Sequence, residues 1–127
     1  MKKTMLAALL IALAMGIATG AREKNSVATG WVSDENCGAQ HTKPGGANCI
    51  RKCIKGGQDI GHPEWKPQRV VFVRDTDKKV WIVSNPEALK GHEGDHVRIA
   101  GRFNASGNSL RVVEVSTLND AGEKQSH

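Results

Sequence analysis

Four short segments in the second half of the chain combine β-branched and aromatic residues with flanking turn residues. Such runs predict strands, and their spacing predicts two strand pairs. Asp75-Thr76-Asp77 is a turn cluster within the first pair, and residues 104–108 form a turn within the second. Because strands must bury one face in a sheet, the fold class is mainly β. The four predicted strands are residues 70–73, 80–83, 97–101 and 110–115.

A fifth predicted strand lies at residues 26–32, ahead of these pairs. Its alternation places Val27, Thr29 and Trp31 on one face. Gly30 interrupts that pattern and indicates a bend or bulge. The strand therefore belongs to the same sheet system but carries a local irregularity.

Residues 33–68 differ in kind, because they are rich in Gly, Pro, Cys and Lys. They allow one short helix at 47–55, which Gly56 and Gly57 would end. We interpret the segment as a cysteine-rich insertion of loop and short helix after the first strand.

A second short helix is predicted at 86–91, where Asn85-Pro86-Glu87 is a good helix start. The order is then strand, insertion, two strands, short helix, two strands. Five strands with a helix between the third and fourth is the order of a small OB-like Greek-key barrel. Another small barrel or a half-open β-sandwich has the same spacing and stays open as an alternative.

The N-terminus predicts a cleavable bacterial secretion signal of the Sec type over residues 1–20. Lys2 and Lys3 precede an apolar run at 5–17, and small residues follow at 18–21. The run is shorter than the roughly 20 residues that span a bilayer. We expect a periplasmic or secreted domain over 26–118 with no membrane anchor, followed by a disordered polar tail at 119–127.

Charge and motif content narrow the classes of function. The formal charge of +5 falls to +3 without Lys2 and Lys3, which makes oligonucleotide binding unlikely for this exported chain. The sequence has no Gly-x-Ser-x-Gly elbow and no phosphate-cradling loop. Its His-Glu-x-x-His match at residues 92–96 lies in a Gly-rich turn rather than on a helix, so we do not expect an enzyme. His92 and His96 lie in a Gly-rich turn and are expected to be solvated. The tryptophans are expected in the core: Trp31, Trp65 and Trp81.

The chemically suggestive residues are three cysteines and one histidine within the insertion. Cys37 and His41 are four residues apart, as are Cys49 and Cys53. On a helix, residues four apart project from one face. Three thiolates and one imidazole make a complete tetrahedral set for Zn²⁺, and soft sulfur also suits Cu(I). The segment therefore predicts a Cu or Zn site at Cys37, His41, Cys49 and Cys53.

Oxidation offers an alternative use of the same thiols, because exported chains commonly form disulfides. Cys49 and Cys53 are poor partners for each other on one helix face, so Cys37 would pair with one of them. The third thiol would stay free, and redox catalysis is disfavoured by the Cys-x3-Cys spacing. The chain would then be a disulfide-stapled interaction module that binds protein, peptide or carbohydrate without metal.

The cysteine segment also resembles a family of small exported bacterial OB-like proteins of unknown function. The shared pattern is Gly-x-x-x-Asp-x-x-Cys-Gly-x-x-His, then Cys-x3-Cys, then a later Gly-x-x-Val-x-Val-x-Gly strand, and it covers residues 30–118. The resemblance implies the fold and the shared segment but supplies no reaction and no ligand. Its residues in the segment are Asp34, Cys37, His41, Cys49 and Cys53.

Overall fold

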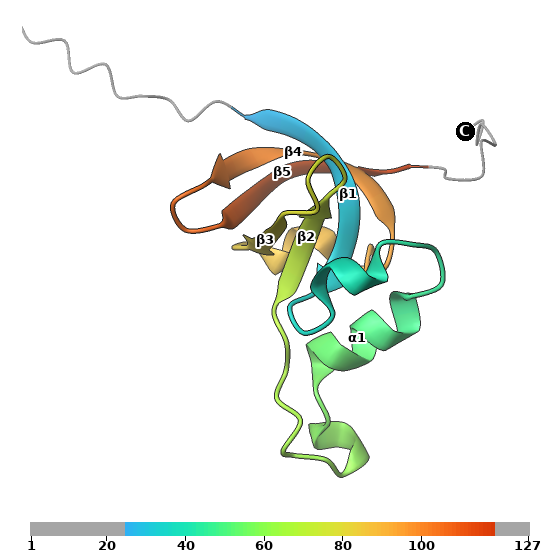
Figure 1. Cartoon of the computed structure of the whole chain (residues 1–127). Coiled ribbons are helices and arrows are strands. Elements are labelled where there is room, and N and C mark those ends of the chain that lie inside the picture. Colours follow the sequence, from blue (N-terminus) through green and yellow to red (C-terminus); the bar gives the residue numbers. More distant parts are fainter. Residues whose placement is uncertain (1–24, 119–127) are drawn as a thin grey trace, which may run out of the picture.

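A computed structural model of the protein describes residues 25–118, which form a closed five-stranded β-barrel (Figure 1). The strands follow one another around the barrel in the order β1-β2-β3-β5-β4, and β4 closes the ring by pairing with β1. Neighbouring strands are antiparallel except for β3 and β5, which are parallel. The strands are β1 Ser26–Asp34, β2 Val70–Arg74, β3 Val80–Val83, β4 His96–Asn104 and β5 Ser109–Thr117.

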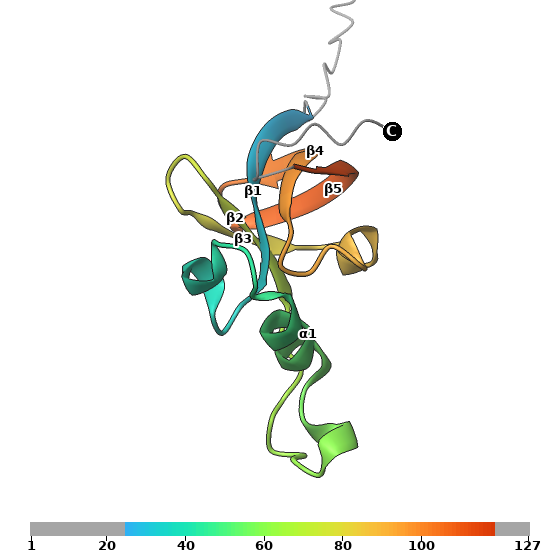
Figure 2. The same cartoon turned by 90° about the vertical axis from the view of Figure 1, so that its right-hand side faces the viewer.

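The helical segments of the described residues lie in two connections. A 3-10 turn, η3 (Pro86–Leu89), joins β3 to β4. The connection from β1 to β2 contains η1 (Gly38–His41), α1 (Ala47–Lys55) and η2 (Gln58–Ile60). In two views at right angles, α1 and the segment after it project from one end of the barrel (Figures 1 and 2). Among the described residues, no helix is long and apolar enough to cross a membrane.

This architecture confirms the predicted fold class, including the insertion after the first strand and the short helix between the third and fourth. The predicted helix at 47–55 coincides with α1. β1 runs two residues further than predicted, through Asp34, so the insertion begins at residue 35. The signal peptide predicted at 1–20 and the tail predicted at 119–127 lie outside the described residues.

The barrel interior is filled by residues that alternate along the strands. Three aromatic rings meet there edge to face, with the Trp81 and Phe103 centroids 5.0 Å apart and those of Phe72 and Phe103 6.3 Å apart. Such edge contacts are a preferred geometry for aromatic pairs. The buried core cluster consists of Val32, Phe72, Trp81, Val83, Leu89, Val97, Ile99, Leu110 and Val112.

Gly30 permits a close approach between β1 and β2 within this core. It pairs with Arg74 of β2 on one side and Val97 of β4 on the other. A Cβ atom at this position would lie 2.1 Å from the Val73 carbonyl oxygen and 2.7 Å from Phe72 Cζ. The observed register shift is instead in β4, between Ala100 and Gly101. The glycine is therefore required by contact with β2.

The outer face of the barrel carries a buried polar contact that the sequence did not predict. The His96 ring stacks on Trp31 with centroids 4.7 Å apart, and its Nε2 lies 2.6 Å from Asp75 Oδ2. The expectation that His96 is solvated is wrong, since only 18% of its side chain is exposed. His92 is 29% exposed and lies 3.4 Å from Asp95. The stack joins β1 and β4 to the turn after β2.

The insertion is attached to the barrel at several points. Ile50 of α1 is fully buried. A Cβ atom on Gly94, in the loop before β4, would lie 2.5 Å from Ala47 Cα, so the loop packs tightly against the start of α1. At the base, Glu35 accepts hydrogen bonds from the Arg69 backbone at 3.0 Å and its guanidinium at 2.8 Å. Both ends of the insertion are therefore fixed by the barrel.

We predict that Gly30→Ala destabilises the protein by about 3 kcal/mol, because the added methyl group must displace β2 or the Phe72 ring. Urea denaturation followed by tryptophan fluorescence measures the loss. Gly107→Ala is the matched control, because the nearest side-chain atom to its new Cβ would be 3.7 Å away. Equal stability of the two variants would contradict the close-approach account.

Candidate metal centre

A tight turn at the end of β1 positions Cys37. The Asp34 carboxylate is the pivot, since its Oδ1 accepts hydrogen bonds from the backbone N–H groups of Asn36 and Cys37, both at 3.0 Å. The Ser33 hydroxyl donates to the Gly38 carbonyl at 2.9 Å. Gly38 has a φ of +48°, a left-handed conformation that a glycine adopts without strain. Two consecutive strand residues thus hold the turn from both sides.

His41 ends the short helical turn η1 that starts directly after Cys37. Its imidazole ring packs on Gly46, the residue that precedes α1. A Cβ atom on Gly46 would lie 2.9 Å from His41 Nδ1 and 3.3 Å from its Cγ. A 3-10 turn, rather than the predicted α-helical spacing, therefore brings Cys37 and His41 together, and the missing side chain of Gly46 leaves room for the ring.

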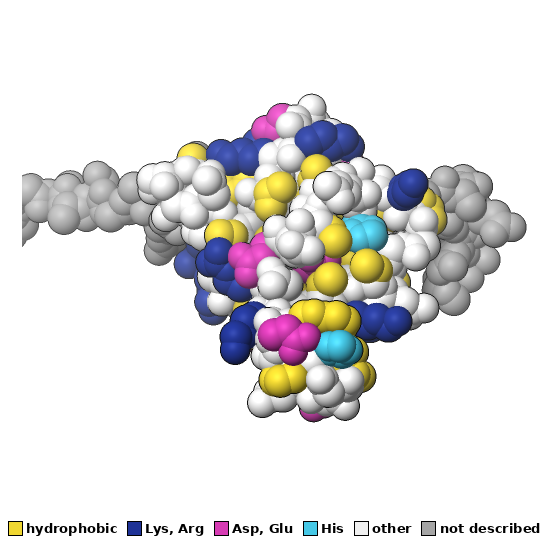
Figure 3. Space-filling view, turned by 60° about the horizontal axis from the view of Figure 1, so that its bottom comes forward, with side chains coloured by type: hydrophobic (Ala, Val, Ile, Leu, Met, Phe, Trp, Pro, Cys, Tyr) yellow, Lys and Arg dark blue, Asp and Glu magenta, His cyan; other side chains and the backbone are white. Residues whose placement is uncertain are grey.

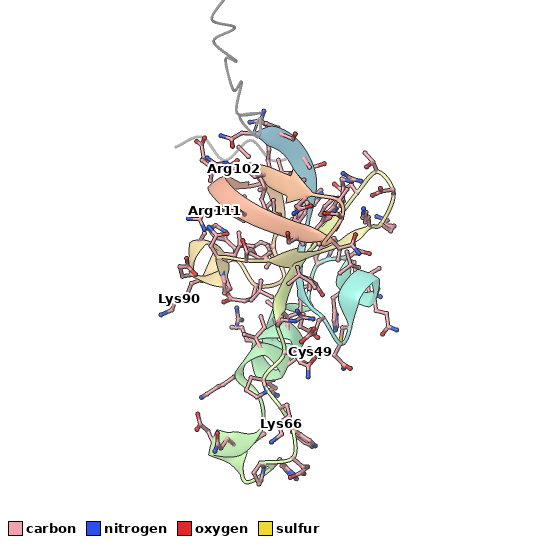
Figure 4. All side chains as sticks on the ribbon, turned by 90° about the vertical axis from the view of Figure 1, so that its left-hand side faces the viewer. Cys49, Lys66, Lys90, Arg102 and Arg111 are labelled. Atoms are coloured by element: carbon pink, nitrogen blue, oxygen red, sulfur yellow. The ribbon has the colours of Figure 1, made fainter. Side chains whose placement is uncertain are left out.

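α1 presents the other two cysteines one turn apart. Cys49 is exposed and Cys53 is half-buried, while Ile50 anchors the helix from its buried side. Gly56 ends the helix with a φ of +77°, and its N–H donates to the Lys52 carbonyl at 3.0 Å. Figure 4 shows Cys49 beside α1, close to the barrel. The two sulfurs therefore lie at different depths from the surface.

The possible ligand atoms of the cluster fall into two groups of three that share Cys37. One group is Cys37, His41 and Cys49, and the other is Asp34, Cys37 and Cys53. Within each group, the ligand atoms all lie within 4.8 Å of one another. A tetrahedral Zn²⁺ ion separates its sulfur and nitrogen ligands by about 3.4–3.8 Å, which a small side-chain movement would reach. The protein thus contains Cys/His groups close enough to hold a metal ion.

The four ligands predicted from the sequence are all in these groups, but they do not share one group. Cys53 belongs with Asp34 rather than with His41 and Cys49. Asp34 is the residue that the sequence prediction did not include among the ligands. An Asp three residues before Cys37 was a signal for a side-chain-capped turn. Its nearness to Cys53, however, follows from the packing of α1 against the end of β1.

The environment of the cluster keeps the thiols of Cys37 and Cys53 protonated when no metal is bound. Burial, the Asp34 carboxylate and Cys49 raise the pKa of Cys37. Burial, followed by the charges of Asp34 and Cys37, raises the pKa of Cys53 to about 11. Metal binding requires thiolates, so an ion that enters must displace these protons. Metal affinity should therefore rise with pH.

The structure does not support a disulfide, because all three cysteines are free. Cys49 and Cys53 lie on successive turns of α1, where both Cβ atoms lean in the same direction. A disulfide between Cys37 and either Cys49 or Cys53, formed by an external oxidant, stays an alternative prediction, because each of those two sulfurs lies within 4.8 Å of the Cys37 sulfur.

A groove of about 480 Å³ runs beside Cys49 and Cys53. Trp65 lines it and is 53% exposed, so the expectation that Trp65 belongs to the core is wrong. His62 stacks on Trp65 with ring centroids 4.0 Å apart, and it belongs to neither metal-ligand group. In a view onto this end of the molecule, side chains of the hydrophobic class lie between acidic and basic ones (Figure 3). The groove gives solvent access to Cys49 and Cys53.

Comparison with known proteins does not supply a function. No protein-family model, curated protein or solved structure matches the chain. The chemistry of the cluster is therefore inferred from its own residues.

We predict that Gly46→Ala weakens metal binding on the order of 10-fold, because its methyl group would push the His41 ring aside. Gly46 has φ −83° and ψ −7°, so alanine fits the backbone and the fold should persist. Competition with a chromophoric chelator measures the affinity, and circular dichroism checks the fold. An affinity equal to that of Gly107→Ala would show that the His41 position is unimportant.

We also predict that iodoacetamide modifies Cys49 well before Cys53 in the metal-free protein at about pH 8. Cys49 is exposed, whereas Cys53 is half-buried with a pKa of about 11 and reacts mainly as a thiolate. Peptide mass spectrometry over a time course gives both rates. The Cys53 rate should rise as the pH approaches 11, and equal rates at pH 8 would contradict the assignment.

Proposed function

We propose that this domain is an exported metal-binding module that holds a thiophilic ion, Cu(I) or Zn²⁺, in its cysteine-rich insertion. The observation that carries the proposal is the convergence of Cys37, His41 and Cys49, whose ligand atoms lie within 4.8 Å of one another. Cys37 lies in the turn before η1, His41 ends η1 and Cys49 is in α1, so their convergence is not a simple result of sequence spacing.

The ligand chemistry selects the class of ion. Two thiolates and one imidazole are soft to borderline donors, which favour Cu(I) and Zn²⁺ over Mg²⁺ or Ca²⁺. Three ligands suffice for Cu(I) in a low-coordinate site. Zn²⁺ takes a fourth ligand, which Cys53, at the far side of Cys37, or water can supply.

The position of Cys49 supports metal handling over a purely structural role. Its side chain is exposed and faces the groove, so an incoming chelator or partner protein can reach a ligand of the ion. Structural zinc sites are closed, and their metal is needed for folding. Here the barrel core contains no cluster residue, so the barrel does not depend on the ion for its packing.

The predicted secretion signal gives the proposal its cellular setting. In the periplasm or outside the cell, metal binding and oxidation compete for the same thiols. Copper is among the metals met there, which makes Cu(I) as plausible a cargo as Zn²⁺. The module would bind and not catalyse, and its partners would be the metal ion and an unidentified protein or small ligand.

Metal titration of the reduced protein tests this function. We expect Cys37→Ser, His41→Ala and Cys49→Ser each to lower Cu(I) affinity by at least about 100-fold. The loss of a residue that only hydrogen-bonds to a metal ligand already costs about 10–100-fold. His62→Ala is the matched control, because this histidine lies outside both groups. Competition with bicinchoninate measures each affinity.

The same preparation distinguishes metal binding from the disulfide alternative. Protein purified from the periplasm would be analysed for bound metal and for free thiols by alkylation and mass spectrometry. Three thiols that become protected on adding metal support the proposal. Two oxidised cysteines, together with no uptake of Cu(I) or Zn²⁺ after reduction, would overturn it.

A further inference from the structure

The second ligand group has features of a metal position in its own right. Asp34, Cys37 and Cys53 place a carboxylate oxygen and two sulfurs within 4.8 Å of one another. This group lies on the inner side of the cluster, because Asp34 is fully buried and Cys53 is half-buried. It shares Cys37 with the outer group of the proposed function, and no other ligand.

The Asp34 carboxylate supplies an independent sign that this position takes a cation. Its Oδ1 is occupied by the two turn hydrogen bonds, but its Oδ2 is buried and has no hydrogen-bond partner. None of the ion pairs among the described residues involves Asp34. Because a buried, unpaired carboxylate oxygen is costly, most such groups have a partner. Within its ligand group, the neighbours are the sulfurs of Cys37 and Cys53.

We infer that the insertion holds two divalent ions rather than one, with the Cys37 thiolate bridging them. The inference rests on the proposed function, since the outer ion is the one bound by Cys37, His41 and Cys49. The inner ion would be bound by Asp34, Cys37 and Cys53. A thiolate sulfur has more than one lone pair available, so it can bind two metal ions at once.

Charge balance favours two divalent ions in this cluster. Three thiolates and one carboxylate carry four negative charges when all are deprotonated, and a single divalent ion neutralises half of that charge. Two divalent ions balance it fully, with His41 neutral as a metal-bound imidazole is. Asp34 is fully buried, and an uncompensated charge at that position would be strongly disfavoured.

The donor set of the inner position also selects its ion. A carboxylate oxygen is a hard ligand and suits Zn²⁺ better than Cu(I), which prefers thiolate. Zinc should therefore load both positions. A stoichiometry of two zinc ions separates this arrangement from a single site that uses Asp34 as an additional ligand.

Zinc stoichiometry in reduced full-length mature protein tests the inference. Native mass spectrometry, with zinc titration against a chromophoric chelator, would compare wild type with Asp34→Asn and Cys53→Ser. Asparagine keeps Oδ1 for the turn hydrogen bonds and removes the carboxylate charge, so Cys37 should stay in place. Cys53→Ser removes the other inner ligand from a different element, which protects the test if one variant fails to fold.

We expect two Zn²⁺ ions in the wild type and one in Asp34→Asn or Cys53→Ser. Adding His41→Ala to either variant should abolish tight binding of the remaining ion. Cys37→Ser should bind neither zinc ion tightly. One Zn²⁺ in the wild type, or two in both inner variants, would overturn the second position and leave the proposed function intact. No binding of either metal to the wild type would instead overturn both.

Discussion

The hydrogen bonds of Asp34 connect the barrel to the cluster. Asp34 is the last residue of β1 and pairs with Val70, the first residue of β2, so its backbone belongs to the barrel. Its side chain belongs to the cluster, because Oδ1 holds the turn that positions Cys37. Since Cys37 is common to both ligand groups, both proposed metal positions depend on this one carboxylate.

The second requirement is that α1 reaches the end of β1 in a fixed orientation. Buried Ile50 and the contact between Gly94 and Ala47 press the helix against the barrel end. One turn of helix then separates Cys49, near His41, from Cys53, near Asp34. A helix rotated about its axis would move the Cys53 sulfur away from the Asp34 carboxylate. Barrel packing therefore sets the chemistry of the insertion.

Much of the fold could be predicted from the sequence, because it depends on local patterns. The strands followed from β-branched residues bounded by turns, and the end of α1 followed from Gly56 and Gly57. Strand order then restricted the topology to a few small barrels or a half-open β-sandwich. The predictions failed where tertiary contacts decide, as with exposed Trp65, which stacks on His62, and shielded His96, which stacks on Trp31. The division of the ligands between two groups, and the part of Asp34 in one of them, also required the packing of α1.

The base of the insertion has a thermodynamic consequence. Residue 34 pairs with residue 70, and the Glu35 N–H donates to the Arg69 carbonyl at 3.0 Å, so the two ends of the segment meet in the barrel wall. Strand pairing therefore offsets the entropic cost of closing this loop, whether or not a metal is present. An ion within the loop would order only the loop itself. The domain should accordingly have two units of cooperativity, with an insertion that opens at low free energy while the barrel stays closed.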